Sequence, residues 1–404
     1  MMKSSLPLIF CLVTSTVAAK PKLSDSWEID DSCDGARLEK LEDAHSEIVE
    51  LLTKVTSDLA HVQQPRPETR WGKPNWDRIA RNLAGLFGLQ SGDTFIENGY
   101  DPGEQHFSQV LYTYDRMYQA LVKGKTLPEN GYSGKLKDQN QHSKPLLLCG
   151  DTRNWEFFDQ NTPDKYDKSK KVAEVFPDAA KHGGAFIRGN RYLAATPGNR
   201  NPDLCTGKLG FTLISQDLIT ICDGTLQFDV EKWPVRDGGE VVADTDLDKA
   251  HFGRQSLVRV MLHEFAHYYG SKVDGNELKR LPDQQAVDTN GCLLWTGDRG
   301  KLVREPQTAD GRDLPQQVVF GFRFCTNLNK DQTGNENSGK FLKDGAYVAG
   351  TLGTMGPSVA TWTAETYAYF AIISLLEESS KNNVRTDLFV SKVARAVYLG
   401  QGIV

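Results

Sequence analysis

The most informative stretch of this chain is Leu257-Val258-Arg259-Val260-Met261-Leu262-His263-Glu264-Phe265-Ala266-His267-Tyr268-Tyr269-Gly270. Apolar residues fill most of its positions, which predicts a buried helix that ends near Gly270. His263 and His267 are four residues apart, so they lie one turn apart on the same face of that helix. Both imidazoles can reach one Zn²⁺, and Glu264 beside them can act on a water at the metal. The HExxH pattern therefore predicts one catalytic zinc per chain.

A catalytic zinc needs a third protein ligand and an open coordination position. No histidine follows His267, so a third ligand downstream of the motif must be a carboxylate. The candidates are Asp274, Asp288, Asp344 and Glu365. Two of them have an alternative interpretation, because Glu365 could instead orient a ligand histidine and Asp344 could be a turn residue.

Composition and the N-terminus indicate a secreted globular protein. The 404 residues carry a formal net charge of -6, and 39% of them are hydrophobic. This balance excludes a wholly disordered chain and argues against a general nucleic-acid-binding surface. The apolar run 6–13 follows Lys3 and precedes small residues that end at Ala19, which is the layout of a signal peptide spanning 1–19. No later run is long enough to span a bilayer, so we expect an extracellular chain that forms a single domain over 20–404.

The cysteine count predicts disulfides. Of the seven cysteines, Cys11 leaves with the signal peptide, and an even number remains. An even number in a secreted chain predicts three disulfides, although the sequence does not determine their pairing. The six are Cys33, Cys149, Cys205, Cys222, Cys292 and Cys325.

The N-terminal third of the mature chain has helical periodicity. Apolar residues recur at three- and four-residue steps over 38–62, which predicts a long amphipathic helix that stops before Pro65. Two more helices are predicted over 76–87 and 107–122. This helical part, about 36–125, is either packed against the core or a detachable pro-segment.

The remaining chain contains strand-like patterns followed by helix-like patterns. Strands are predicted within 145–149, 185–194 and 209–222, and helices over 255–269, 363–378 and 387–399. The polar region between Gly270 and Thr363 is expected to form extended loops held by Cys292 and Cys325. Helices, then a small sheet, then helices indicate an α+β domain.

The last third of the chain resembles the fungal deuterolysin-type zinc endopeptidases, the aspzincins, and their relatives that resemble lysine-specific metalloendopeptidases. The motifs that carry the resemblance are the HExxH helix, Asp344-Gly345-Ala346-Tyr347, and Thr363-Ala364-Glu365-Thr366-Tyr367-Ala368-Tyr369-Phe370-Ala371. This likeness implies a zincin-like metalloprotease domain. It makes Asp344 the first candidate for the third ligand and Glu365 the second, and it implies that Tyr347 donates a hydrogen bond to the oxyanion.

The resemblance implies a secreted endopeptidase in which Glu264 is the general base and proteins or peptides are the substrates. We expect a monomer that binds neither nucleic acid nor membranes. An alternative function is a secreted or surface protein that binds zinc on the same fold without proteolysis, as a zinc scavenger, antigen or effector. Retention of Glu264 in the motif favours catalysis.

Overall fold

The computed structural model describes residues 20–89, 105–127, 144–228 except 152, 166, 189, 190, 199 and 200, and then 247–248, 255–274, 277–329, 338–343 and 346–379. The predicted signal peptide 1–19 and the predicted helix 387–399 lie outside these residues. Within them, the chain is a mixed α+β protein with several small sheets. No helix of the described part is long and apolar enough to cross a membrane.

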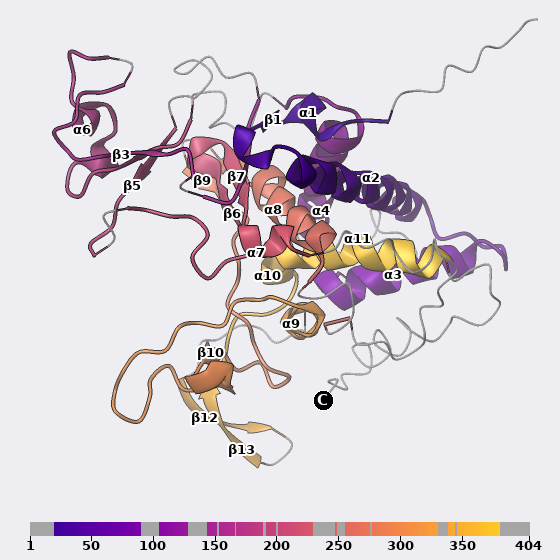
Figure 1. Ribbon diagram of the computed structural model, residues 1–404. Coiled ribbons are helices and arrows are strands. Elements are labelled where there is room, and N and C mark those ends of the chain that lie inside the picture. Colours follow the sequence, from indigo (N-terminus) through magenta and orange to yellow (C-terminus); the bar gives the residue numbers. More distant parts are fainter. Residues whose placement is uncertain are drawn as a thin grey trace, which may run out of the picture.

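Five helices form the main body of the protein (Figure 1). They are α2 (Ala36–Val62), α3 (Lys73–Phe87), α4 (Gln105–Met117), α8 (Leu257–Gly270) and α11 (Ala364–Ser379). The predicted helices over 38–62, 76–87, 107–122, 255–269 and 363–378 are therefore confirmed, with η2 (Tyr118–Val122) continuing α4. The last of the five, α11, is mostly apolar, and its residues from Tyr367 to Ile373 are at most 1% exposed, so it forms the centre of the core.

A four-stranded sheet lies against the helices in the order β1-β2-β7-β6. Its strands are β1 (Glu28–Ile29), β2 (Leu146–Cys149), β6 (Gly210–Leu213) and β7 (Leu218–Ile221). The pairs β1 with β2 and β2 with β7 are parallel, whereas the edge strand β6 runs antiparallel to β7. Side chains alternate along β2, so Leu147 packs in the helical core and Leu146 and Leu148 pack in a smaller cluster on the opposite face.

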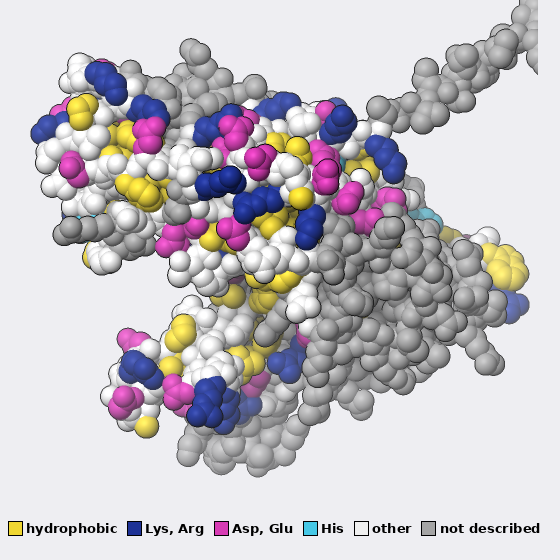
Figure 2. Space-filling view, in the orientation of Figure 1, with side chains coloured by type: hydrophobic (Ala, Val, Ile, Leu, Met, Phe, Trp, Pro, Cys, Tyr) yellow, Lys and Arg dark blue, Asp and Glu magenta, His cyan; other side chains and the backbone are white. Residues whose placement is uncertain are grey.

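Two smaller parts extend from this body (Figure 1). A three-stranded antiparallel sheet with a short helix forms the first part: β3 (Glu156–Phe158), β4 (Gly184–Phe186), β5 (Tyr192–Ala194) and α6 (Val172–Val175). The second contains two hairpins, one of β10 (Trp295–Thr296) and β11 (Leu302–Val303), the other of β12 (Ser338–Lys343) and β13 (Ala346–Thr351). Charges of both signs are interspersed over the face shown in Figure 2.

The remaining short elements connect these parts. They are α1 (Leu23–Ser26), η1 (Asp31–Cys33), η3 (Pro177–Ala179), η4 (Ile214–Gln216), α7 (Asp223–Leu226), β8 (Lys272–Asp274), β9 (Glu277–Lys279), η5 (Asp298–Gly300), α9 (Phe322–Leu328) and α10 (Pro357–Ala360). The prediction of extended loops between Gly270 and Thr363 was therefore only partly right, because hairpins and short helices occupy much of this region.

Two of the three expected disulfides are present. Cys33 bonds to Cys149 and Cys205 to Cys222. The prediction of a third disulfide was wrong: Cys292 and Cys325 are buried thiols. Burial raises the pKa of the Cys325 thiol well above its usual value, which keeps it protonated and unreactive. The packed core around α9, rather than a cross-link, therefore holds this region.

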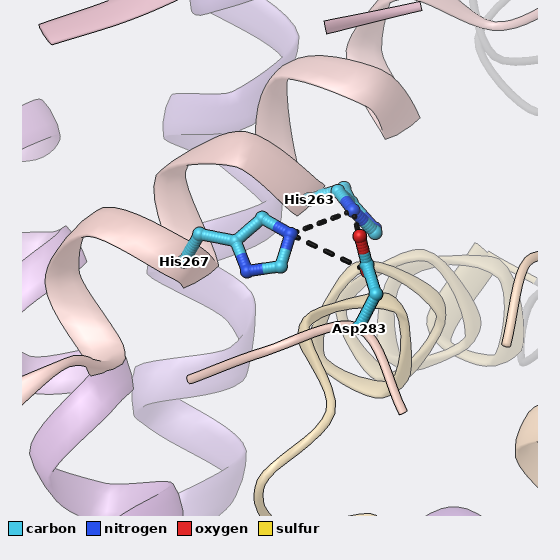
Figure 3. A group of neighbouring side chains, drawn as sticks. All are labelled: His263, His267 and Asp283. Carbon is cyan, nitrogen blue, oxygen red and sulfur yellow. Dashed lines mark hydrogen bonds and ion pairs between the residues drawn. The ribbon is translucent and has the colours of Figure 1, made fainter. Parts of the chain in front are cut away.

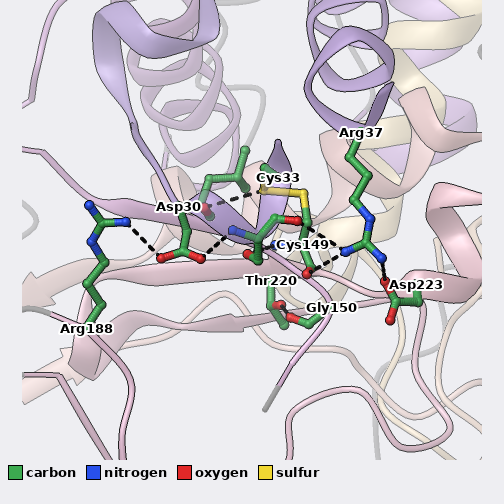
Figure 4. Close-up of a disulfide and its surroundings, with 10 residues drawn as sticks. Asp30, Cys33, Arg37, Cys149, Gly150, Arg188, Thr220 and Asp223 are labelled. Atoms are coloured by element: carbon green, nitrogen blue, oxygen red, sulfur yellow. Dashed lines mark hydrogen bonds and ion pairs between the residues drawn. A yellow bond between two sulfur atoms is a disulfide. The ribbon is translucent and has the colours of Figure 1, made fainter. Parts of the chain in front are cut away.

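The disulfide Cys33–Cys149 joins the N-terminal segment to the sheet (Figure 4). Beside it, Arg37 at the start of α2 donates to the carbonyls of Ser32 and Cys149, each at 3.2 Å, and pairs with Asp223 at 3.0 Å. These contacts attach the first turn of α2 to both η1 and the end of β2. The N-terminal helices are thus anchored covalently and by packing to the sheet.

Candidate metal centre

Helix α8 presents the three polar residues of the HExxH pattern from an otherwise apolar segment. Ser256 caps its first turn by accepting a hydrogen bond from the amide of Arg259 at 3.2 Å. The helix lies in the core, packed against α2, α4, α11 and strand β6. His263 is 6% exposed and Glu264 5%, while the His267 side chain is 12% exposed. The apolar positions of the helix therefore hold these three polar side chains at one end of a rigid element.

His263 and His267 come together with Asp283, a residue that the sequence analysis did not include among its candidates (Figure 3). The two Nε2 atoms are 3.0 Å apart, and Asp283 Oδ1 lies 3.1 Å from His263 Nε2 and 3.4 Å from His267 Nε2. Tetrahedral ligands at the usual zinc–nitrogen and zinc–oxygen distances are separated by about 3.3 Å. The three atoms therefore form a triangle of the size that one zinc ion requires.

The outer nitrogens of both imidazoles face groups that accept hydrogen bonds. His267 Nδ1 lies 2.5 Å from the carbonyl oxygen of Leu281, and His263 Nδ1 lies 2.8 Å from Glu365 Oε2. A carbonyl and a carboxylate can only accept, so both Nδ1 atoms carry a proton and neutral rings leave the Nε2 lone pairs pointing inward. Two lone pairs and a carboxylate oxygen then converge without a donor. A cation satisfies this arrangement, either a proton on one Nε2 or a metal ion between the three atoms.

Glu365 contacts the outer nitrogen of the His263 ring, which is the position of an orienting residue and not of a ligand that shares the Nε2 side. Its side chain is completely buried, and Arg259 Nη1 donates to its two oxygens at 2.7 and 2.8 Å. The amide of Gly321 donates to Oε1 at 2.7 Å. Burial raises the pKa of Glu365, but Arg259 and His263 outweigh it and hold the pKa below its usual value. Glu365 is therefore an anion whose oxygens are already engaged on the outer side of the His263 ring.

A short chain reversal after α8 carries Asp283. The strands β8 and β9 pair in an antiparallel hairpin and return the chain to the end of the helix. There the Ser271 hydroxyl donates to the His267 carbonyl at 2.7 Å and accepts from the Leu281 amide at 2.9 Å. Next to Asp283, Gln284 Nε2 donates to the carbonyl of Trp362 at 3.2 Å. These bonds fix the loop so that the Asp283 carboxylate faces both histidines while the side chain stays 38% exposed.

Among the other carboxylates considered for the third ligand, Asp288 lies outside this cluster. Asp288 pairs with Arg304 at 2.6 Å and accepts from the amides of Asn290 and Cys292. Asp344 lies outside the described residues, and the side chain of Asp274 does as well. Little in the sequence marks Asp283 as a ligand: it lies sixteen residues after His267, in the segment Leu-Pro-Asp-Gln.

Tyr347, the expected oxyanion donor, is described only through its backbone. It lies in β13 opposite Leu342 of β12. This hairpin lies at the far end of the molecule from α8 in Figure 1. The structure therefore does not bring the strand that carries Tyr347 to the histidines.

The electrostatics of the cluster favour positive charge. Burial lowers the pKa of His263, but Asp283 and Glu365 more than offset this and raise it well above its usual value. Burial likewise lowers the pKa of His267, and Asp283 again raises it overall. The burial of Asp283 is also outweighed, because the two histidines lower its pKa far below the usual range. A proton and a metal cation compete for the same three atoms.

Glu264, the proposed base, contacts strand β6. Its Oε2 accepts a hydrogen bond from the hydroxyl of Thr212 at 2.7 Å. Gly210 of the same strand lies directly against the rest of the carboxylate. The Glu264 side chain therefore packs on the edge of the sheet, on the helix that also carries His263 and His267.

A comparison of the chain with protein-family models, with curated proteins and with solved structures found no match. The resemblance to the deuterolysin-type peptidases therefore stays a prediction from motifs. The geometry of His263, His267 and Asp283 is the observation that points to a function.

Proposed function

We propose that this chain is a secreted zinc-dependent endopeptidase, with a zincin-like domain of the deuterolysin type. The observation that carries the proposal is the triangle formed by His263 Nε2, His267 Nε2 and Asp283 Oδ1, with edges of 3.0 to 3.4 Å. Two imidazoles and one carboxylate are a donor set typical of catalytic zinc. Three protein ligands leave one coordination position open. Catalytic zinc sites have such a position, whereas structural zinc sites are closed by a fourth protein ligand.

The remaining residues fit peptide hydrolysis. Bound zinc supplies Lewis acidity and lowers the pKa of a water molecule in the open position. Glu264 follows His263 directly in sequence, and its carboxylate can take a proton from an attacking water. The same carboxylate can return that proton to the leaving amine of the cleaved bond. Arg259 and Glu365 hold His263 in the orientation that this chemistry requires.

The edge of the sheet supports a peptide substrate. Strand β6 pairs with β7 on one side and has no further strand neighbour among the described residues. Its four residues are all partly exposed. An extended peptide can add to such an edge through main-chain hydrogen bonds, beside the carboxylate of Glu264. Because this mode uses the backbone of the substrate, it suits an endopeptidase.

We propose an extracellular location for this protein. The predicted signal peptide 1–19 directs export, and two disulfides are compatible with an extracellular protein. We propose that the protein acts as a monomer on proteins or peptides and binds neither nucleic acid nor membranes.

The test compares the mature wild-type protein with Glu264→Gln. Elemental analysis should find one zinc in both, and casein hydrolysis should be lost only in Glu264→Gln, because the amide cannot accept the proton. His182→Ala, a change at an exposed histidine remote from α8 in sequence, is the control and should retain both properties. Absence of zinc from the wild type would overturn the proposal.

A second candidate function is zinc binding without proteolysis. One observation favours it: the strand that carries Tyr347, the expected oxyanion donor, lies away from α8. This function predicts one zinc in the wild type and in Glu264→Gln, with no casein hydrolysis by either protein. The same experiment therefore separates the two candidates.

A further inference from the structure

The carboxylate of Glu264 is held by a hydroxyl from another element. Thr212 Oγ1, on β6, lies 2.7 Å from Glu264 Oε2 and 3.1 Å from the main-chain oxygen of the same residue. A hydroxyl has one proton to donate, and the shorter contact to the charged oxygen is the stronger of the two. Donation to Oε2 leaves Oε1 as the oxygen without this hydrogen bond.

Gly210 closes the other side of the carboxylate. A Cβ atom added at Gly210 would lie 2.7 Å from Glu264 Oε1 and 2.8 Å from Cγ, which is closer than real Cβ contacts. The backbone of Gly210 is not in the left-handed region, so its conformation alone would accept an alanine. The obstacle to a side chain at this position is Glu264 itself.

We propose that Gly210 and Thr212 are positioning residues for Glu264. Together they restrict a flexible side chain, 5% exposed, to one arrangement in which Oε2 accepts from the Thr212 hydroxyl and Oε1 lies against Gly210. Holding a catalytic group in its reacting geometry lowers the barrier because its conformational freedom is given up before the reaction. This inference rests on the proposed function, since it assigns a role within the same reaction.

The first experiment tests the contact without using activity. A double-mutant cycle combines Gly210→Ala with Glu264→Ala and measures the urea midpoint of each protein. Gly210→Ala should lower the midpoint when Glu264 is present and should leave it nearly unchanged in the Glu264→Ala background. Gly224→Ala, at a helical glycine with open space around it, is the control and should show no such coupling. Equal shifts in both backgrounds would overturn the proposed packing.

The second experiment tests the role in hydrolysis. Thr212→Val removes the hydroxyl and keeps the branched shape, so kcat should fall roughly 10- to 100-fold, the effect of losing a hydrogen bond to a charged group. KM and the zinc content should stay unchanged, and Thr212→Ser should restore most of kcat. The matched control is Thr220→Val on β7, where the hydroxyl donates to the carbonyl of Gly150 at 2.6 Å.

The outcomes separate this inference from the proposed function. If the wild type hydrolyses casein and Thr212→Val keeps a normal kcat, or loses zinc along with activity, the positioning role is overturned. If the wild type binds zinc and hydrolyses nothing, the proposed function fails and the catalytic role of β6 fails with it. The stability cycle still decides in that case whether Gly210 packs against Glu264.

Discussion

Two carboxylates near His263 have different tasks because they approach different nitrogens of the ring. Glu365 Oε2 meets Nδ1 at 2.8 Å from the buried side, and Asp283 Oδ1 meets Nε2 at 3.1 Å from the exposed side. Only the second faces the Nε2 atom of His267 as well. The direction of approach therefore distinguishes the proposed metal ligand from the proposed orienting residue, although both are acidic residues downstream of one motif.

Replacement of Asp283, the proposed third zinc ligand, should strongly weaken zinc binding. Asp283→Asn removes the charge that faces both histidines, so zinc affinity should fall by more than the roughly 10- to 100-fold typical of losing an orienting partner. Asp344→Asn should keep its zinc. Chelator competition on the purified proteins measures both, with the exposed Asp178→Asn as the control. Loss of zinc in Asp344→Asn with retention in Asp283→Asn would assign the third ligand to Asp344.

Replacement of the orienting residue should affect both metal and fold. Glu365→Gln removes the charge that pairs with the fully buried Arg259, so the free energy of unfolding should fall by about 3 kcal/mol or more. Zinc affinity should fall roughly 10- to 100-fold, because His263 loses its anionic partner. Urea unfolding and chelator competition provide the two measurements, with Glu305→Gln, at an exposed position, as the control. Unchanged zinc affinity in Glu365→Gln would contradict the role assigned here.

Helix α2 illustrates how a pattern predicts an element but not all of its contacts. Its apolar stripe predicted the helix, and Leu41, Ile48 and Val55 are indeed fully buried. The stripe did not reveal that His45 is buried between them, with Nε2 placed 3.0 Å from the carbonyl of Leu121 in η2. Nε2 can donate to this carbonyl in either protonation state, but burial lowers the pKa of His45 and favours the neutral ring. Protonation of this ring inside the core is therefore unfavourable to the packing of α2 on η2.

The stability of this contact should depend on pH. Burial lowers the pKa of His45 below its ordinary value of 6.5, although Glu42 partly opposes this. The unfolded chain therefore takes up the proton first, so the stabilisation is present above pH 6.5 and is lost as the pH falls through the lower folded-state pKa. His45→Gln keeps a donor for Leu121 and does not titrate. Relative to this variant, the wild type should lose up to about 1.4 kcal/mol per pH unit below pH 6.5.

Urea unfolding of both metal-free proteins between pH 5 and 8 measures this difference. Because the metal ligands titrate equally in the two proteins, their contribution cancels in the comparison. A difference that does not change with pH would contradict the assignment of a neutral buried His45.

In the whole molecule, the N-terminal helices and the helix that carries the candidate metal centre share one core. Helix α2 packs against α8 and α11, and β1 pairs with β2 at the start of the sheet. The disulfide Cys33–Cys149 spans a sequence separation of 116 residues and joins the same two segments (Figure 4). Removal of residues 36–125 would expose the apolar faces of α8 and α11 to water.

We therefore expect residues 36–125 to remain in the functional protein. Mass spectrometry of the secreted, zinc-loaded protein should find a chain that begins near Lys20. A version that lacks 20–125 should show neither a cooperative urea transition nor bound zinc, because the core that holds α8 is incomplete. A zinc-bound, active species that begins after residue 125 would show instead that the helical part is a pro-segment.

The sequence by itself determined the features that depend on local patterns. Helix α8, its two histidines and Glu264 followed from the spacing within one motif, because residues four apart share a helix face whatever surrounds them. The stripe of α2 and the apolar run of α11 likewise marked helices before any contact was known. The cysteine count indicated disulfides, but it predicted one more than the described residues form.

Only the tertiary structure decided which distant residues complete the site. Asp283 reaches the histidines because the hairpin of β8 and β9 reverses the chain and Ser271 binds both sides of the turn. Glu365 reaches His263 because α11 packs against α8, and Thr212 reaches Glu264 because β6 is the edge of the sheet beside that helix. These contacts depend on how elements pack, and no spacing along the chain specifies that arrangement.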